Sequence, residues 1–216
     1  MKEQTYAHKA SISSGLKYGF IIIFKPFAGF SDMKNEKKGN IISSLIFIFL
    51  LILSSIIMQQ YSGFIFNTNN VKLLNIIDEI TKVIGPIILW CIASWCVTTL
   101  IDGEGSFKDI VMSIGYAIIP LLLTRILYTV LTNILILDEG AVNGVILSIG
   151  TIWMGLLVFS STLTIHQFSF SKTIFAIGAS IVSIGIIIFI GLLFINLIEQ
   201  MYDYFYSIFR EILLRL

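Results

Sequence analysis

The chain has 216 residues, of which 56% are hydrophobic and only 12% are charged, and its mean hydropathy is +0.94. A soluble domain carries about a quarter charged residues, so this composition excludes an ordinary water-soluble enzyme, and it is far too apolar for a disordered chain. Because 14 Lys and Arg are balanced by 13 Asp and Glu, a nucleic-acid-binding protein with a basic surface is also disfavoured, and a membrane protein remains.

The first 40 residues are expected to form a cytoplasmic N-terminal arm, which carries seven lysines. Within it, Ser14–Phe24 is amphipathic and ends at Lys25-Pro26, since proline disfavours helical geometry in the preceding residue. This interfacial segment either lies in the headgroup layer or packs as a loop under the bundle. The apolar run 18–24 is too short for a cleavable signal peptide and precedes no small-residue cleavage pattern, so none is expected.

Five stretches are long and apolar enough to cross a membrane, which takes about 20 residues. The third joins two charge-free runs separated only by Arg125, and it would form one helix of about 42 Å. The predicted spans are Ile41–Met58, Val83–Ile101, Ile110–Leu137, Val142–Ile165 and Ile174–Ile198. The predicted fold is therefore all-α: a polytopic bundle of five transmembrane helices in residues 41–198, with flanking amphipathic helices.

Two further amphipathic helices are predicted beside these spans. Val71–Lys82 is expected to lead into the second span. Residues 199–216 form a C-terminal amphipathic helix with an apolar face at helical spacing; its five charges make it too polar to span. This tail either lies on the outer leaflet or docks onto a partner helix.

The placement of basic residues predicts the orientation. With five spans and a cytoplasmic N-terminus, nine lysines fall inside, whereas four basic residues fall outside: Lys72, Lys82, Arg210 and Arg215. This asymmetry follows the positive-inside rule and places the C-terminus outside.

Arg125 is the one charge near membrane depth, and it has two interpretations. If Asp109 marks the inner face, Arg125 lies about 24 Å along the helix, within snorkelling reach of the outer headgroups. Alternatively, it faces the bundle interior and pairs with Asp78 or Glu79, because ionisable residues inside membranes often serve a function.

The loop 102–109 holds three carboxylates, but it does not fit a calcium loop, since Phe107 stands where glycine is required and Ser113 where the bidentate acid is required. Ser106 and Asp109 instead fit a capping box that starts the third span, and Gly103 and Gly105 fit a tight turn. The chain also lacks an H-E-x-x-H zinc motif, paired intramembrane aspartates and a phosphate-binding glycine loop. We therefore expect no enzyme activity, no metal and no cofactor, and a solvated or locally hydrogen-bonded His166.

Small residues recur at four-residue spacing in the last two spans. Gly140, Gly144 and Ser148 form one such stripe, and Ala176 and Ser180 form another. Such stripes allow helices to approach closely, so they predict tight packing within the bundle or against a partner helix.

Two blocks of the sequence resemble the Yip domain family of five-span membrane proteins. Phe24-Lys-Pro-Phe-Ala-Gly-Phe30 is similar to the family's proline-then-aromatic entry. Asp102-Gly-Glu-Gly-Ser-Phe-Lys-Asp109, followed by Ser113-Ile-Gly-Tyr-Ala-Ile-Ile-Pro120, resembles its G-x-G-S-F-K turn and G-Y-A-x-x-P helix. The similarity extends over residues 20–200, and the Ile-, Lys- and Asn-rich composition resembles bacterial members. Pro120 is expected to kink the third span.

The resemblance implies a non-enzymatic accessory or scaffold protein of the bacterial cell membrane, which associates with other membrane proteins. Bacterial relatives are often found alongside ABC transporter components, so ABC-type transporter subunits and lipid are the implied partners, and a homo-oligomer is left open. The alternative is a small transporter or channel subunit. The expected contact and motif residues are Pro26, Phe30, Asp102, Gly103, Gly105, Ser106, Phe107, Gly115, Tyr116 and Pro120, with Arg125 as the intramembrane charge.

Overall fold

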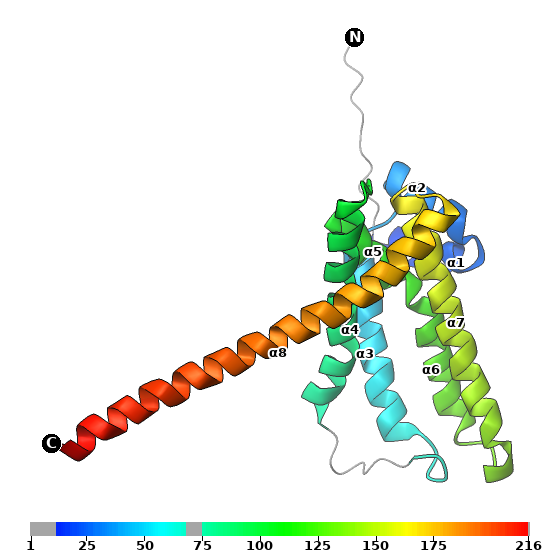
Figure 1. Ribbon diagram of the computed structural model, residues 1–216. Coiled ribbons are helices and arrows are strands. Elements are labelled where there is room, and N and C mark those ends of the chain that lie inside the picture. Colours follow the sequence, from blue (N-terminus) through cyan, green and yellow to red (C-terminus); the bar gives the residue numbers. More distant parts are fainter. Residues whose placement is uncertain (1–11, 68–74, 216) are drawn as a thin grey trace.

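The computed structural model describes residues 12–67 and 75–215 (Figure 1). Within these ranges the chain is helical and contains no strand. The elements are α1 (Ile12–Phe24), α2 (Pro26–Asn35), α3 (Ile41–Tyr61), α4 (Ile76–Leu100), α5 (Phe107–Ala117), α6 (Ile119–Leu131), the short 3-10 helix η2 (Leu137–Glu139), α7 (Gly140–Ile165) and α8 (Phe170–Arg215).

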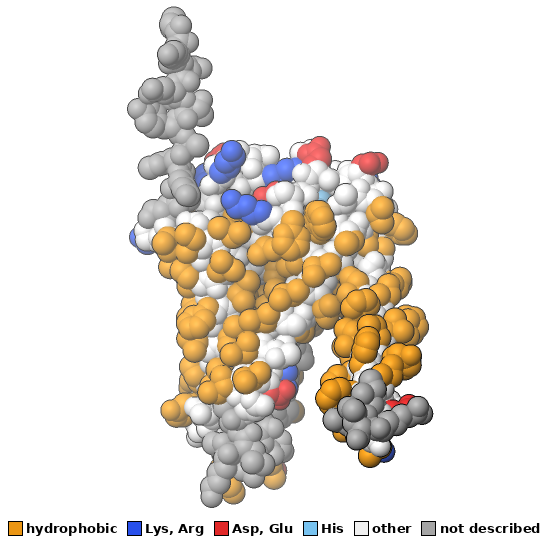
Figure 2. All heavy atoms as spheres, turned by 90° about the vertical axis from the view of Figure 1, so that its left-hand side faces the viewer, with side chains coloured by type: hydrophobic (Ala, Val, Ile, Leu, Met, Phe, Trp, Pro, Cys, Tyr) orange, Lys and Arg blue, Asp and Glu red, His pale blue; other side chains and the backbone are white. Residues whose placement is uncertain are grey.

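Five helical segments of the described chain are long and apolar enough to cross a membrane, which confirms the predicted number. They are Ile41–Tyr61, Ile76–Leu100, Phe107–Leu131, Leu137–Ile165 and Phe170–Glu211. Figure 2 shows the corresponding surface: a broad band of hydrophobic side chains, with most of the visible charged side chains at one end. The end that carries α1 and α2 is called the motif end below, and the end with the α6–α7 connection is called the far end.

The N-terminal arm forms a helical hairpin, α1–α2, at the motif end. Pro26 occupies the first turn of α2, where its missing N–H costs no hydrogen bond. The hydroxyl of Tyr18 donates a 2.7 Å hydrogen bond to the carbonyl of Gly29, and Ile22 and Phe30 are fully buried. One face of α1 therefore packs against the bundle as a helix, whereas Phe20 on its other face stays exposed.

The predicted Val71–Lys82 helix is only partly visible, because residues 71–74 lie outside the described ranges. From Ile76 onward it is continuous with the second span as α4, and the side chain of Asn75 caps it by accepting from the N–H of Ile77.

The third span is broken, and it ends earlier than the predicted single helix Ile110–Leu137. The kink expected at Pro120 is confirmed, since α5 stops at Ala117 and α6 starts at Ile119. Proline cannot donate to the carbonyl of Tyr116, and the N–H of Ile118 contacts that carbonyl instead. At the far end, Thr132 is the first residue after α6, and its hydroxyl oxygen accepts a hydrogen bond from the N–H of Gly63 at 3.1 Å.

The broken helix α5–α6 occupies the centre of the bundle. It is the most buried of the five spans, and it contacts α3, α4 and α7. Two glycines set its distance from its neighbours. A Cβ added to Gly115 of α5 would lie 2.7 Å from the backbone oxygen of Ser44 in α3, and one added to Gly150 of α7 would lie 2.8 Å from Cβ of Thr124 in α6.

The two stripes of small residues have different surroundings. Gly144 and Ser148 are exposed, and an added Cβ at Gly144 would meet nothing within 4 Å. These two members of the stripe therefore do not pack inside the chain, whereas a Cβ added to the third, Gly140, would lie 2.9 Å from the ring of Phe66. Ala176 and Ser180 are buried where α8 meets α4 and α7.

Helix α8 runs without a break through 46 residues, a length of about 69 Å. The predicted boundary between the fifth span and the tail at residue 199 thus falls inside one helix. Thr173, Ala176 and Ser180 of its first turns are buried, whereas no described side chain of α8 beyond Ser180 is buried. Figure 1 shows α8 leaving the other helices and projecting away from them.

The substitution Gly115→Val tests whether the α3–α5 contact holds the bundle together. The added side chain has to push α5 away from the backbone of Ser44, so we expect a loss of about 1–3 kcal/mol in the free energy of unfolding. Thermal unfolding of the detergent-solubilised protein measures it. Gly155→Val in α7 is the matched control, because its added Cβ meets nothing within 4 Å; equal melting temperatures for the two variants would contradict this packing.

Candidate functional site

The turn between α4 and α5 is built from residues 102–106 at the motif end. Asp102 adopts a left-handed conformation (φ 56°), and the N–H of Gly103 donates to the carbonyl of Thr98 at 2.8 Å, which ends α4. Glycine is required at two positions, because an added Cβ would lie 2.6 Å from the His166 ring at both Gly103 and Gly105.

The predicted capping box at the start of α5 is confirmed. The N–H of Asp109 donates to the hydroxyl oxygen of Ser106 at 3.3 Å, and the N–H of Ser106 donates to the carboxylate of Asp109 at 3.0 Å. These bonds satisfy two backbone donors that the first turn of a helix otherwise leaves unpaired.

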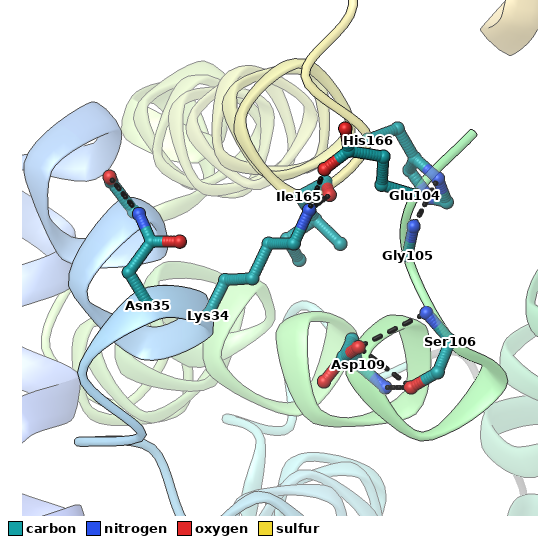
Figure 3. A network of polar contacts seen from close by, with 9 residues as sticks. Lys34, Asn35, Glu104, Gly105, Ser106, Asp109, Ile165 and His166 are labelled. Carbon is teal, nitrogen blue, oxygen red and sulfur yellow. Dashed lines mark hydrogen bonds and ion pairs between the residues drawn. The ribbon is translucent and has the colours of Figure 1, made fainter.

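Lys34 joins three parts of the chain at this end, as Figure 3 shows. Its ammonium donates to the carboxylate of Glu104 and to the carbonyl of Ile165, both at 2.8 Å. The second bond satisfies one of the last carbonyls of α7 with a cation, which is favourable at the negative end of a helix. Lys34 thereby ties α2 to the 102–106 turn and to the end of α7.

His166 is the residue at this end whose role the sequence interpretation missed. We expected it to be solvated or bonded locally, but it is only 3% exposed. Its Nδ1 accepts a 3.2 Å hydrogen bond from the N–H of Gly105, its ring stacks on Phe168 at 5.3 Å, and Lys172 lies over that phenyl ring. The pairing of the glycine turn with a histidine 61 residues away leaves no local sequence signal.

The environment of His166 favours the neutral imidazole. Burial, together with the nearby charge of Lys34, lowers the pKa of His166 to about 4, and Asp109 acts in the opposite direction. A neutral ring with an unprotonated Nδ1 is also the form that can accept the N–H of Gly105.

The expected contact residues fall into two groups. Gly115, Tyr116 and Pro120 lie inside the bundle, where Tyr116 is fully buried and its hydroxyl accepts from the N–H of Asn40 at 3.2 Å. Pro26 and Phe30 belong to the α1–α2 hairpin and contribute to packing.

Of the same set, the exposed residues are Asp102 and Ser106 of the turn and Phe107, the first residue of α5. Phe107 contacts the Trp95 ring edge to face at 5.8 Å. Because the packing residues and the surface residues form one connected unit, a substitution at Gly105 acts on folding as well as on any surface contact.

Arg125 lies in α6 toward the far end, and it faces a cavity that Glu79 of α4 also lines. Its Nη1 atom is buried and has no hydrogen-bond partner among the described residues. Metal binding has no support in the described ranges, since they contain no group of three His, Cys, Asp or Glu residues that could hold an ion.

The fold and the two polar ends define a polytopic, all-helical integral membrane protein with five apolar spans. The family model described as Yip1 domain matches residues 20–192, which is most of the chain, and the protein belongs to this family. The match confirms the resemblance inferred from residues 24–30 and 102–120. No curated protein and no solved structure matches the chain significantly.

The depressed pKa of His166 makes stability depend on pH. The folded chain binds this proton less readily than the unfolded chain, whose histidine has a pKa near 6.5. The neutral His166 ring therefore makes its full contribution to the free energy of unfolding above about pH 6.5. This contribution decreases as the pH falls toward 4, by up to about 3 kcal/mol. Melting temperatures measured between pH 7.5 and 4 check this.

His166→Asn is the control for this pH dependence, since an amide oxygen can accept from Gly105 but does not titrate. Its melting temperature is expected to fall less steeply over the same range, while the carboxylates common to both proteins titrate alike. Identical slopes for the two proteins would show that His166 does not contribute.

Proposed function

We propose that this Yip1-family protein is a non-enzymatic accessory or scaffold subunit that holds another integral membrane protein through helix α8. The observation that carries the proposal is the exposure of α8. In the most apolar window of this span none of the residues is buried inside the chain, compared with 61% in the corresponding window of α5–α6.

The length of α8 supports a protein partner rather than lipid alone. A helix of about 69 Å exceeds the roughly 30 Å hydrocarbon layer more than twofold, so lipid tails do not cover all of its apolar side chains when it crosses the membrane upright. Met201, Phe205 and Phe209 lie in the part after residue 198 and are each at least 60% exposed. A helix of another membrane protein, packed alongside, would bury them.

The orientation that we propose places the motif end in the cytoplasm. Its described lysines are Lys17, Lys25, Lys34, Lys37, Lys38, Lys108 and Lys172, and the far end has fewer basic residues. This asymmetry supports an N-terminus inside and a C-terminus outside in a bacterial cell membrane. The cytoplasmic turn 102–107 then offers a second contact surface.

Membrane subunits of an ABC-type transporter are the partner class to test first, because bacterial members of the Yip domain family often occur beside such components. No phosphate-binding glycine loop is present in this sequence, so ATP hydrolysis would come from the partner assembly.

Glycines that face outward allow this docking to be tested without disturbing the bundle. An added Cβ meets nothing within 4 Å at Gly185 and Gly191 of α8, or at Gly155 of α7. We expect Gly185→Leu combined with Gly191→Leu to reduce recovery of the partner at least tenfold after mild detergent extraction from the native host. Mass spectrometry of the bound integral membrane proteins measures the recovery.

Gly155→Leu is the matched control and should retain the partner. Equal recovery with the control and with the α8 variant would refute docking through α8. The alternative function, a transporter or channel, predicts solute flux through liposomes that contain only this protein, and such flux would replace the accessory role.

A further inference from the structure

The far end of the bundle contains a polar cavity of about 140 Å³, which the family assignment does not explain. It lies between the end of α3, residues 62–67, the start of α4, and α6. Its lining residues are Ser55, Met58, Gln59, Ser62, Phe66, Asn67, Glu79, Arg125 and Tyr128. Because one water fills about 30 Å³ of liquid, the cavity is several times too large for a single water molecule.

One wall presents the carboxylate of Glu79, which is only 4% exposed. Its Oε1 accepts from the Lys82 ammonium at 2.8 Å and from the Gln59 amide, and its Oε2 accepts from the hydroxyl of Ser55 at 3.2 Å. A carboxylate has about four acceptor positions, so three donors leave Oε2 able to accept one more.

The facing wall presents the guanidinium of Arg125. Its Nη1 is buried without a hydrogen-bond partner among the described residues, and no ion pair joins it to an acidic side chain in those ranges. A buried cation without an acceptor is unfavourable. The cavity therefore offers donors on one side and an acceptor on the other, and the two do not meet.

The charges around the cavity select the kind of guest. Asp78 and Glu79 are balanced by Lys82 and Arg125, and Lys82 is paired with both acids. A guest with a net charge would disturb this balance, whereas a zwitterion would not. An anionic group suits Arg125, whose planar fork binds phosphate in a bidentate manner, and a group with N–H donors suits Glu79.

The depth of the cavity in the membrane agrees with such a guest. Arg125 lies six residues before the end of α6, about 9 Å along the axis, and Glu79 lies in the first turn of α4. Positions this close to the ends of the spans are expected near the boundary between the hydrocarbon and the headgroups, where ethanolamine and choline phospholipids carry a phosphate and an amine in the same headgroup.

We propose that this cavity binds a zwitterionic phosphate–primary-ammonium group, with the phosphate on Arg125 and the ammonium on Oε2 of Glu79. The group comes either from the headgroup of an ethanolamine phospholipid or from a free small solute of the same chemistry. A quaternary ammonium has no N–H and cannot donate to Glu79, so choline headgroups should bind less well.

The experiment uses the full-length, delipidated protein in detergent. Short-chain phosphatidylethanolamine, phosphatidylcholine, phosphatidylglycerol and free glycerophosphoethanolamine, a diester with the same zwitterionic headgroup, are each titrated while the melting temperature and the binding isotherm are recorded. We expect phosphatidylethanolamine to bind at least tenfold more tightly than the choline and glycerol lipids. Binding of glycerophosphoethanolamine with equal affinity identifies a soluble ligand, and weaker binding identifies the lipid; both outcomes support the proposed chemistry.

Variants place the ligand in this cavity. Arg125→Gln should weaken phosphatidylethanolamine binding at least tenfold, Arg125→Lys should weaken it less, and Glu79→Gln should remove the preference over phosphatidylcholine. Arg210→Gln, on the exposed part of α8, is the matched control and should bind normally. The lipid series with the unmodified protein is informative even if a variant does not fold. Equal affinity for all three lipids, or undiminished binding by a folded Arg125→Gln protein, would overturn the proposal.

Discussion

The close contact between α5 and α3 at Gly115 is the constraint on which the rest of the bundle depends. It brings α5 so near to Ser44 that no side chain fits between them, and it places the neighbouring Tyr116 against Tyr18, Phe47 and Asn40. Helix α1 and the start of α3 thus both contact Tyr116. Because the helix is interrupted just before Pro120, α6 is a separate helix from α5. Its Thr124 packs closely against Gly150 of α7. In a membrane, where apolar side chains gain little by leaving lipid, such close packing supplies the cohesion between helices.

This constraint divides the molecule into an enclosed part and an open part. Helices α1, α3, α4 and α7 pack around α5–α6, and the polar network of Lys34, Glu104 and His166 closes the bundle at the motif end (Figure 3). The buried side chains of helix α8 that join it to this unit lie in its first turns, up to Ser180, and from Ile188 onward the described side chains of α8 are exposed. The enclosed part has the properties of a stable scaffold, and α8 has the properties of a helix that meets its partner outside this chain.

The sequence determines the spans well and the tertiary contacts poorly, for physical reasons. Each span is a local property, since its length and apolarity must match the bilayer, and the capping box at Ser106 and the kink at Pro120 are also local. The pairing of His166 with Gly105 and the cavity between Glu79 and Arg125 join residues that are far apart in the chain, and no local spacing encodes them. Gly144 and Ser148 show that a local pattern can also be too permissive. Their small side chains permit close packing, but the sequence does not show on which side a neighbouring helix lies.

Photo-crosslinking in native membranes tests directly whether α8 docks onto another integral membrane protein. A photoreactive amino acid is placed at Gly185 of α8 and, in a separate protein, at Gly155 of α7, which is equally open within the chain. We expect a discrete adduct with one integral membrane protein from position 185 and adducts with lipid alone from position 155. Lipid adducts from both positions, or the same protein adduct from both, would contradict the assignment of α8 as the docking helix.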